Sequence, residues 1–446
     1  EAELPDDIIP AETESEAETP SGEGKHSRVS PFQVPADYQE AYDAVYKVSS
    51  EHLKGVTNNG GKYGNSVLAN LTDGDVNTHW ETGRANSASF KNSVTFTFDE
   101  SVELGSMVYY PRVRGAVNKG FPKAFSIYAS ASEGGEDFTL VLNEKASVTA
   151  GGTQITFDNP TEFRRLRFVF DEANQNWAAA GEMAFYLPDP LVDEVDQLFA
   201  DGTMSSLKPK YQDEALLREM LEKAMTHPNQ LLAEKVQTAL DIQTKAVDYA
   251  SKVQVIEQRG NGVNHARKVL KTSSYASNLL PTGWAARPGD VIKVYVQADE
   301  NGPMPTLVFT QQMGHYGNWR RNYQLHNGEN IFTAPTIYSE KWAVKSAKGG
   351  AIYVENPYTP EEQGEAPKIR VEGAIDYPLF CDGDDEEAFL EELRAYQEEK
   401  NAHPDTTVDI VELYSDWFIL NGNLQAAKPF LDSGRSPQVT VDLHNS

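Results

Sequence analysis

Short runs that alternate apolar and polar residues fill the chain from about residue 55 to residue 187. Residues 93–98, 125–128 and 166–170 follow this pattern and are rich in β-forming side chains. Glycine turns and an Asn-Pro pair separate the runs, and no long helical repeat lies between them. Many short strands at near-regular spacing predict an antiparallel β-sandwich over residues 37–189, opened by a short helix at 37–49.

A different period begins near residue 191. Paired apolar residues recur every four positions between 213 and 225, which places them on one stripe of a helix with Asp213 as its N-cap. Pro228 interrupts this helix, and a second amphipathic helix is expected at 231–253. The pattern predicts a helical hairpin that serves as a spacer over residues 190–268, with its Met and Leu stripe as core.

Alternation returns from about residue 272. Residues 292–298 alternate after a Gly- and Pro-containing turn, and 305–309, 330–332 and 350–354 continue as strands. The acidic run 382–399 has a helical period and predicts one amphipathic helix with a solvated acidic face. We therefore expect a mainly β protein with a helical insert, in which two antiparallel β-sandwiches are joined by an α-helical hairpin and the second sandwich spans 269–446.

Composition and charge narrow the possible partners. The 446 residues include 39 Lys and Arg and 67 Asp and Glu, which gives a formal charge of −28. Such acidity argues against nucleic acid as a partner, because phosphate binding needs clustered bases. We expect no transmembrane segment, since no apolar run is long enough. The single cysteine, Cys381, is expected to be structural or unreactive.

The first 36 residues are predicted to form a flexible acidic leader. Nine acids precede the first base, Lys25, in a run rich in Pro, Ser and Gly. No basic and apolar targeting stretch opens the chain, so we expect that any signal peptide has been removed or never existed. A tether of this kind suits a secreted or cell-surface protein, which we expect to be a monomer.

Residues 70–80 bring carboxylates, a glycine and other oxygen-bearing side chains into one short stretch. Asp73 and Asp75 flank Gly74, and Thr78 follows. A tight glycine turn lets side-chain and backbone oxygens converge on one hard cation, and Ca²⁺ takes about six to eight oxygens. An ordinary Asp-Gly turn explains the same residues without a metal, so the spacing alone leaves both interpretations open.

Four motifs in order, at 73–80, 108–112, 126–130 and 180–186, resemble a discoidin or coagulation factor five/eight C-type domain. Galactose-binding-like carbohydrate modules are similar to it, so the resemblance implies a jelly-roll sandwich that binds glycans. It also implies a structural calcium ion that joins the Asp-Gly loop to a glutamate near the last strand. The implied ligands are Asp73, Asp75, Thr78 and Glu182, with some contacts through backbone carbonyls.

In such modules the ligand lies in loops at one end of the sandwich. Sugar recognition needs an aromatic face together with polar side chains that reach the hydroxyls. The candidates are His79, Arg84, Asn86, Arg112, Arg114, Asn118 and Trp177. Each has a structural alternative, because Arg112 could brace a loop and Trp177 could pack beneath one. Members of this fold also bind lipids or proteins, so the fold does not decide the ligand.

Motifs at 192–209, 280–296, 325–332 and 349–358 resemble the non-catalytic leading region of enhancin-like, mucin-degrading zinc metallopeptidases (peptidase family sixty). The resemblance implies a substrate-targeting front portion of an enzyme that cuts O-glycosylated proteins. The family's zinc-binding His-Glu-x-x-His is absent, since none of the nine histidines precedes Glu. We expect zinc only in a catalytic domain beyond Ser446. A surface lectin or adhesin without any enzyme remains the alternative.

Overall fold

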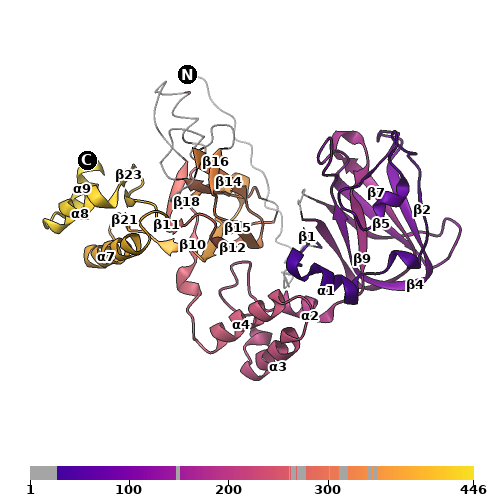
Figure 1. The fold of residues 1–446 in the computed structure, drawn as a ribbon, viewed down its shortest axis with the longest axis horizontal. Coiled ribbons are helices and arrows are strands. Elements are labelled where there is room, and N and C mark those ends of the chain that lie inside the picture. The colour runs from indigo at the N-terminus through magenta and orange to yellow at the C-terminus, as the bar shows by residue number, and fades with distance from the viewer. Residues whose placement is uncertain are drawn as a thin grey trace, which may run out of the picture. The chain divides into compact units, whose positions relative to one another are not determined.

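The computed structural model describes residues 28–146, 151–260, 262, 268, 278–300, 302–310, 320–339, 344–345 and 349–445. Most of the predicted acidic leader, residues 1–27, lies outside the described residues. The chain divides into two compact units, with the division between Pro190 and Leu191 (Figure 1). No helix among the described residues combines the length and the apolar character that a bilayer span needs.

The first unit is an antiparallel β-sandwich. Its main sheet has the order β2-β4-β7-β5-β6, while β1 pairs with β7, β9 pairs with β4, and β3 and β8 form a separate pair. The strands are β1 Val29–Pro31, β2 Leu53–Asn58, β3 Trp80–Glu81, β4 Asn92–Tyr110, β5 Pro122–Ser130, β6 Thr139–Lys145, β7 Thr153–Ala173, β8 Ala179–Ala180 and β9 Glu182–Tyr186. The predicted first sandwich is confirmed.

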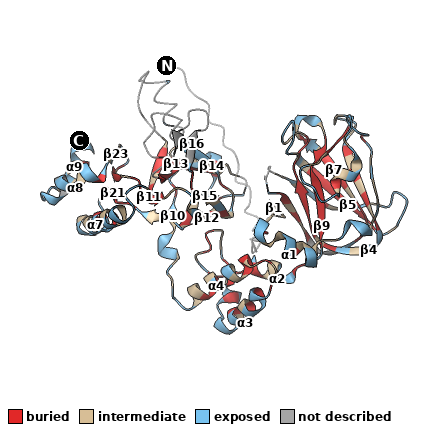
Figure 2. Cartoon of the chain, in the orientation of Figure 1, coloured by how far each residue is buried: buried red, intermediate tan, exposed pale blue. Residues whose placement is uncertain are grey.

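Strand β4 pairs with different neighbours along its length. Residues 94–98 pair with β2, whereas 106–110 pair with β9, and the register against β7 shifts between Thr97 and Val102. Alternate side chains of the first half point inward, so Val94, Phe96 and Phe98 are buried in the core with Trp80. Figure 2 shows the strands labelled β5, β7 and β9 largely as buried, whereas helix α1 is mostly intermediate or exposed.

Helix α1, Ala36–Tyr46, covers the outer side of β9, close to the predicted range of 37–49. The Tyr42 ring stacks on Tyr46 at 4.8 Å between centroids and tilts against Tyr186 of β9 at 5.8 Å. Three short 3₁₀ helices complete the unit, η1 Ser50–His52, η2 Leu68–Leu71 and η3 Asn174–Asn176.

The second unit opens with the predicted helical hairpin. Helices α3 and α4 pack against one another around a shared apolar core, and Asp213 caps α3 by accepting backbone N–H groups of Ala215 and Leu216. The elements are α2 Pro190–Val195, η4 Pro209–Tyr211, α3 Glu214–Met225, α4 Leu231–Gln243 and η5 Ala250–Lys252. The prediction that the second helix reaches 253 is wrong, because Lys245 takes a left-handed conformation (φ 57°) that ends α4.

A second β-sandwich follows, as predicted. One sheet has the order β10-β19-β12-β15 and the other β14-β13-β18-β11-β20. Its elements are β10 Gln254–Val255, β11 Leu279–Ala286, β12 Val291–Gln297, β13 Thr306–Thr310, β14 Arg320–Gln324, β15 Gly328–Thr333, β16 Ile337–Ser339, β17 Val344–Lys345, β18 Gly350–Glu355, α6 Pro360–Gln363, β19 Lys368–Glu372 and β20 Ile375–Asp376. Arg370 is fully buried between the rings of Tyr249 and Tyr295 and donates to the Thr203 carbonyl, which joins the hairpin to this sandwich.

The last part of the chain forms a small α/β layer that the sequence analysis did not separate from the second sandwich. Its sheet pairs β21 and β22 in parallel, and the connection between them carries α7, the amphipathic helix that the acidic run predicts. A parallel pair of strands needs such a crossover connection, whereas the strands of the preceding sandwich pair with antiparallel neighbours. The elements are β21 Leu379–Cys381, α7 Glu386–Ala402, β22 Val411–Tyr414, β23 Ile419–Gly422, α8 Leu424–Asp432 and α9 Pro437–Asn445.

Candidate functional site

The Asp-Gly loop lies between η2 and β3 and is held by its own side chains. The Asp73 carboxylate accepts the backbone N–H of Asp75 at 2.9 Å and the Thr78 hydroxyl at 2.9 Å. Gly74 has φ 80°, a left-handed conformation in which glycine carries no steric penalty. The loop therefore turns sharply and keeps the Asp73 and Thr78 oxygens side by side.

Glu182, the first residue of β9, meets this loop. Its side chain is buried, with 3% of the residue exposed, and it accepts the backbone N–H of Gly74 at 3.3 Å. Burial raises the pKa of the Glu182 carboxyl to about 7, while Lys47 opposes the rise and the nearby Asp73 carboxylate adds to it. The structure thus brings together three of the four predicted ligands, Asp73, Thr78 and Glu182.

The oxygen chemistry at this point fits a hard cation. Two carboxylates, one of them buried, lie close enough for the charge of Asp73 to raise the pKa of Glu182, and a bound cation would relieve that repulsion. Backbone carbonyls also crowd the residue before Glu182, because a Cβ on Gly181 would lie 2.8 Å from the Val76 oxygen. Carboxylates, a hydroxyl and carbonyls are the ligands that Ca²⁺ prefers.

Asp75 is placed differently from the other three. Its carboxylate is exposed and accepts the backbone N–H and the side-chain amide of Asn77 at 2.9 and 3.0 Å, and these bonds lower the pKa of Asp75. The side chain is thus engaged within its own turn. A side-chain role for Asp75 as a metal ligand stays a prediction.

A second cluster lies in loops of the same unit and centres on the buried carboxylate of Glu81, which is 1% exposed. Glu81 forms ion pairs with both Arg112 and Lys119, whose side chains are 13% and 17% exposed. Glu81 follows Trp80 in β3, whereas the two cations come from the loop between β4 and β5. One buried carboxylate therefore orients two basic side chains at the surface.

Two aromatic rings lie beside these cations. Tyr63 and Trp177 contact edge to face at 6.2 Å between centroids, and the Lys119 ammonium lies 4.7 Å from the Trp177 centroid and 5.3 Å from that of Tyr63. Tyr63 is exposed and Trp177 half-buried. The cluster thus presents aromatic surface next to positive charge and hydrogen-bond donors, which is the combination that carbohydrate rings and hydroxyls need.

His79 and Asn118 border the same cluster. His79 is half-buried, and burial together with the charge of Arg112 lowers the pKa of its imidazole. Asn118 is left-handed (φ 59°), its backbone N–H donates to the Arg112 carbonyl, and its carbonyl accepts the Asn174 amide at 3.0 Å. These bonds tie the Arg112 loop to the loop that carries Trp177.

The remaining candidates have structural contacts. The Arg84 guanidinium lies 3.7 Å from the Phe90 ring centroid. Asn86 donates to the Phe170 carbonyl at 2.6 Å, and its side-chain oxygen accepts the backbone N–H of Asn92 at 2.8 Å. Arg114 is exposed, and its carbonyl accepts the Arg112 side chain. Asn86 therefore braces its loop, and its contact with a ligand stays a prediction, as do those of Arg84 and Arg114.

Sequence reasoning missed Tyr63, Glu81 and Lys119. The signal for Glu81 was a charged residue directly after the core Trp80, which points to a carboxylate at the end of a buried strand. Lys119 is 38 positions from Glu81, so no local pattern links the two.

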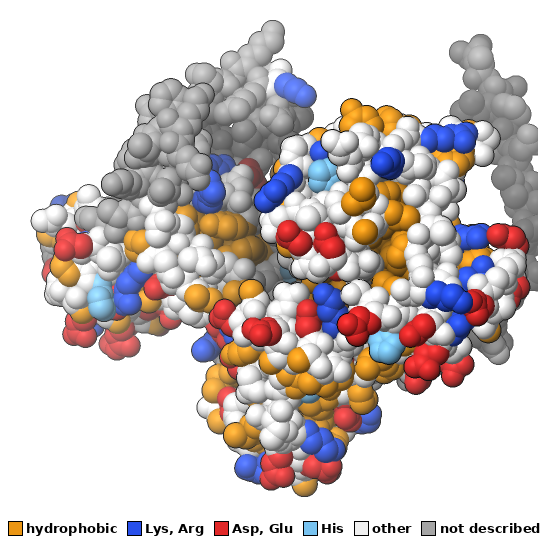
Figure 3. Space-filling view, turned by 45° about the vertical axis from the view of Figure 1, so that its right-hand side comes forward, with side chains coloured by type: hydrophobic (Ala, Val, Ile, Leu, Met, Phe, Trp, Pro, Cys, Tyr) orange, Lys and Arg blue, Asp and Glu red, His pale blue; other side chains and the backbone are white. Residues whose placement is uncertain are grey.

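Figure 3 shows acidic and basic side chains interspersed on the face it presents.

Buried ionisable groups also occur in the second unit. Glu412 is fully buried and accepts the hydroxyls of Tyr353 and Tyr377 and the amide of Asn421, and burial raises its pKa. Burial likewise raises the pKa of the Cys381 thiol to about 12, so this thiol is protonated at neutral pH. The expectation of an unreactive cysteine agrees with this environment.

Comparisons with known proteins agree with this division of the chain. Residues 47–183 match the F5/8 type C domain. An A type blood N-acetyl-alpha-D-galactosamine deacetylase from Flavonifractor plautii is 33% identical over 123 residues, which are 28% of this chain and 15% of that protein. The structure of the CBM32-1, CBM32-2 and M60 catalytic domains of ZmpB from Clostridium perfringens aligns with a TM-score of 0.60 and 32% identity, over 92% of this chain and 42% of that one.

The chain thus spans less than half the length of both relatives. It carries an F5/8 type C, or discoidin, domain at residues 47–183, and as a whole it is similar to a structure that contains CBM32 and M60 catalytic domains. The resemblances identified from the sequence are confirmed on both counts, and the jelly-roll character of the first unit with them.

Proposed function

We propose that this protein is the glycan-binding, substrate-targeting part of a secreted or cell-surface zinc metallopeptidase that acts on O-glycosylated, mucin-like glycoproteins. The observation that carries the proposal is the loop cluster of Tyr63, Trp177, Arg112 and Lys119 around the buried carboxylate of Glu81. The F5/8 type C match of the unit that holds this cluster supports it.

In this proposal the aromatic rings take the apolar side of a sugar, and Arg112, His79 and Asn118 reach its hydroxyls. The pKa of His79 is lowered, so the imidazole is neutral at physiological pH and offers both a donor and an acceptor. The galactose-binding-like resemblance and the N-acetylgalactosamine in the name of the Flavonifractor relative favour terminal galactose or N-acetylgalactosamine as the bound sugar.

A calcium ion held by Asp73, Thr78 and Glu182, with backbone carbonyls and Asp75 nearby, belongs to the same proposal. The buried Glu182 carboxylate and its repulsion with Asp73 support it. The ion would have a structural role, because it would join the loop before β3 to the first residue of β9.

The peptidase context rests on the second unit. Its similarity to the structure that contains the M60 catalytic domain of ZmpB supports a place beside such a domain. The 446 residues contain no His-Glu-x-x-His, so the catalytic zinc of the peptidase would be bound outside them. Holding the enzyme on its glycoprotein would raise the local substrate concentration.

A glycan array probed with the full chain tests the binding function. We expect binding to O-glycans with terminal galactose or N-acetylgalactosamine, and a weaker signal on the same glycans for the Trp177→Ala variant. An array without any bound glycan contradicts the proposal. Incubation with a mucin-type glycoprotein and zinc tests the second part, because chelator-sensitive cleavage by these 446 residues would show that catalysis lies within them.

A further inference from the structure

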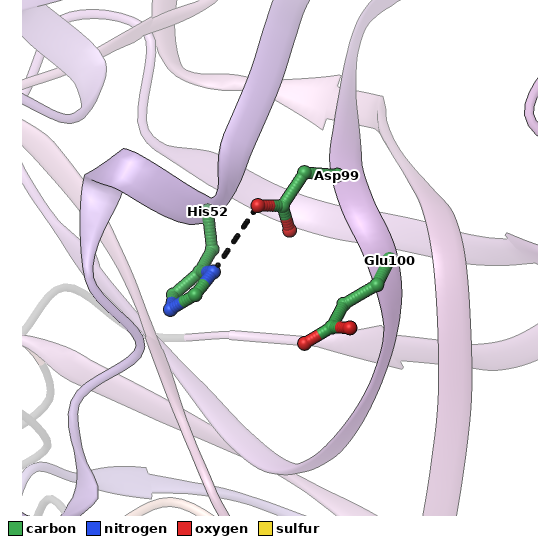
Figure 4. Close-up of side chains that lie close together, drawn as sticks. All are labelled: His52, Asp99 and Glu100. Carbon is green, nitrogen blue, oxygen red and sulfur yellow. Dashed lines mark hydrogen bonds and ion pairs between the residues drawn. The ribbon is translucent and has the colours of Figure 1, made fainter.

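Three potential metal ligands meet on the first unit, apart from the residues assigned to calcium and glycan. His52, Asp99 and Glu100 each offer one ligand atom, and these atoms lie within 4.8 Å of one another. The His52 Nδ1 and an Asp99 carboxylate oxygen are 3.3 Å apart. Figure 4 shows the imidazole and both carboxylates turned toward a common space.

The local backbone explains why the two neighbouring carboxylates converge. In a regular strand, successive side chains point to opposite faces of the sheet. Asp99 and Glu100 lie where β4 departs from its register with β7, between Thr97 and Val102. His52 ends the short helix η1 directly before Leu53, which pairs with Phe98, so the histidine arrives beside this bend.

The charges around the cluster leave the two carboxylates available. Arg164 donates to the backbone carbonyl of Asp99 and forms an ion pair with Glu133, and Lys54, two residues after His52, forms an ion pair with the same carboxylate. Among the ion pairs of the described residues, Asp99 pairs only with His52. Glu100 forms no ion pair with a Lys or Arg of that part of the chain. A cation would therefore neutralise charge that the protein itself leaves unmatched.

We propose that His52, Asp99 and Glu100 bind one divalent transition-metal ion of the zinc type. One imidazole nitrogen with two carboxylate oxygens suits Zn²⁺, and the imidazole distinguishes this site from the all-oxygen set at Glu182. In a tetrahedral zinc site with bonds of about 2.0–2.1 Å, two ligand atoms lie about 3.3 Å apart, which is the separation of Nδ1 and the Asp99 oxygen.

The ion would connect the start of β2 to the bend of β4 and leave its remaining position to water. All three residues are exposed, so the site is reachable from solvent and the substitutions that test it leave the core intact. The stabilisation would add to that of calcium, because no residue is shared between the two sets.

The test is zinc binding by the full chain with calcium present in excess. Calorimetric titration compares the wild type with His52→Ala and Asp99→Asn, and with His403→Ala, which removes an exposed histidine of the second unit. We expect wild type and His403→Ala to bind one equivalent of Zn²⁺ more than the two cluster variants. Zinc should also raise the melting temperature of the wild type and of His403→Ala but not of His52→Ala.

Circular dichroism confirms that each variant is folded before titration. If His52→Ala binds as many equivalents of zinc as the wild type with the same affinity, the inference is wrong and the zinc is held elsewhere. The same holds if the wild type binds no zinc at all. Substitution with Co²⁺ gives a second readout, since a visible absorption band that His52→Ala abolishes reports nitrogen ligation directly.

Discussion

Glu182 accepts the backbone N–H of Gly74 at 3.3 Å, so the last strand of the first sandwich is joined to a loop 108 positions earlier in the chain. The bond brings a buried carboxylate to the exposed Asp73 turn. It aligns two acidic side chains whose repulsion a cation would remove.

Glu182→Gln should therefore abolish calcium binding by the first unit. With calcium at about one hundred times its Kd, the ion is expected to add about 2.7 kcal/mol to the free energy of unfolding of the wild type. Calorimetric titration and thermal melts with calcium or chelator measure the two effects. Glu162→Gln changes an exposed glutamate of β7 and should leave both unchanged. Equal calcium-dependent stabilisation of Glu182→Gln and wild type would contradict the assignment.

Arg112→Ala and Trp177→Ala should each weaken glycan binding about tenfold or more, because a loss of about 1.4 kcal/mol of contact energy has that effect. Titration with the best glycan from the array measures the affinity. Arg218→Ala and Trp417→Ala remove exposed side chains of the same types in the second unit and should bind normally. Unchanged affinity in both Arg112→Ala and Trp177→Ala would show that the sugar does not bind at these loops.

Asn86→Ala should act on stability instead. Its side chain bonds to the Phe170 carbonyl and to Asn92, and the loss of such bonds costs about 1–3 kcal/mol. We expect a lower melting temperature with an unchanged glycan affinity at a temperature where the variant is folded. A folded variant that no longer binds would restore Asn86 to the set of ligand contacts.

Glu81→Gln should lower both stability and glycan affinity. The substitution leaves two half-buried cations, Arg112 and Lys119, without their carboxylate, at a cost of about 2–3 kcal/mol. The freed Arg112 side chain would no longer be oriented toward the ligand. Lys119→Met separates the two effects, since it keeps the Glu81–Arg112 pair; if it weakens binding as much as Glu81→Gln does, Lys119 itself contacts the glycan.

The sequence predicted the features that local patterns encode. Alternation identified the strands around Phe96 and Phe168, and the four-residue period with Asp213 identified the hairpin. The pairing of Glu81 with Lys119 was not predictable, because it depends on how β3 and the Arg112 loop meet in space. The early end of α4 also escaped prediction, since the left-handed Lys245 carries no glycine signal.

Glu412 provides a prediction for the second unit that depends on pH. Burial raises the pKa of this carboxyl above its ordinary 4.5, although Tyr353, Tyr377 and Asn421 donate to it. An acid with a raised pKa in the folded state contributes its stability below the unfolded pKa and loses it as pH rises through the folded pKa. The free energy of unfolding of the wild type should therefore fall relative to Glu412→Gln as pH rises from about 4 toward 7.

Urea unfolding of both proteins across this range measures the difference, in which the titration of the other carboxyls cancels. The Glu412→Gln variant has no charge to bury at this position, so the stability of the variant should lack this component of the pH dependence. At acidic pH the wild type should be the more stable of the two, because a neutral carboxyl has one O–H donor to place among the groups that donate to it, whereas the glutamine amide brings two N–H donors. If the free energy of unfolding of the wild type instead rises relative to that of Glu412→Gln with rising pH, the three donors outweigh burial and hold Glu412 ionised.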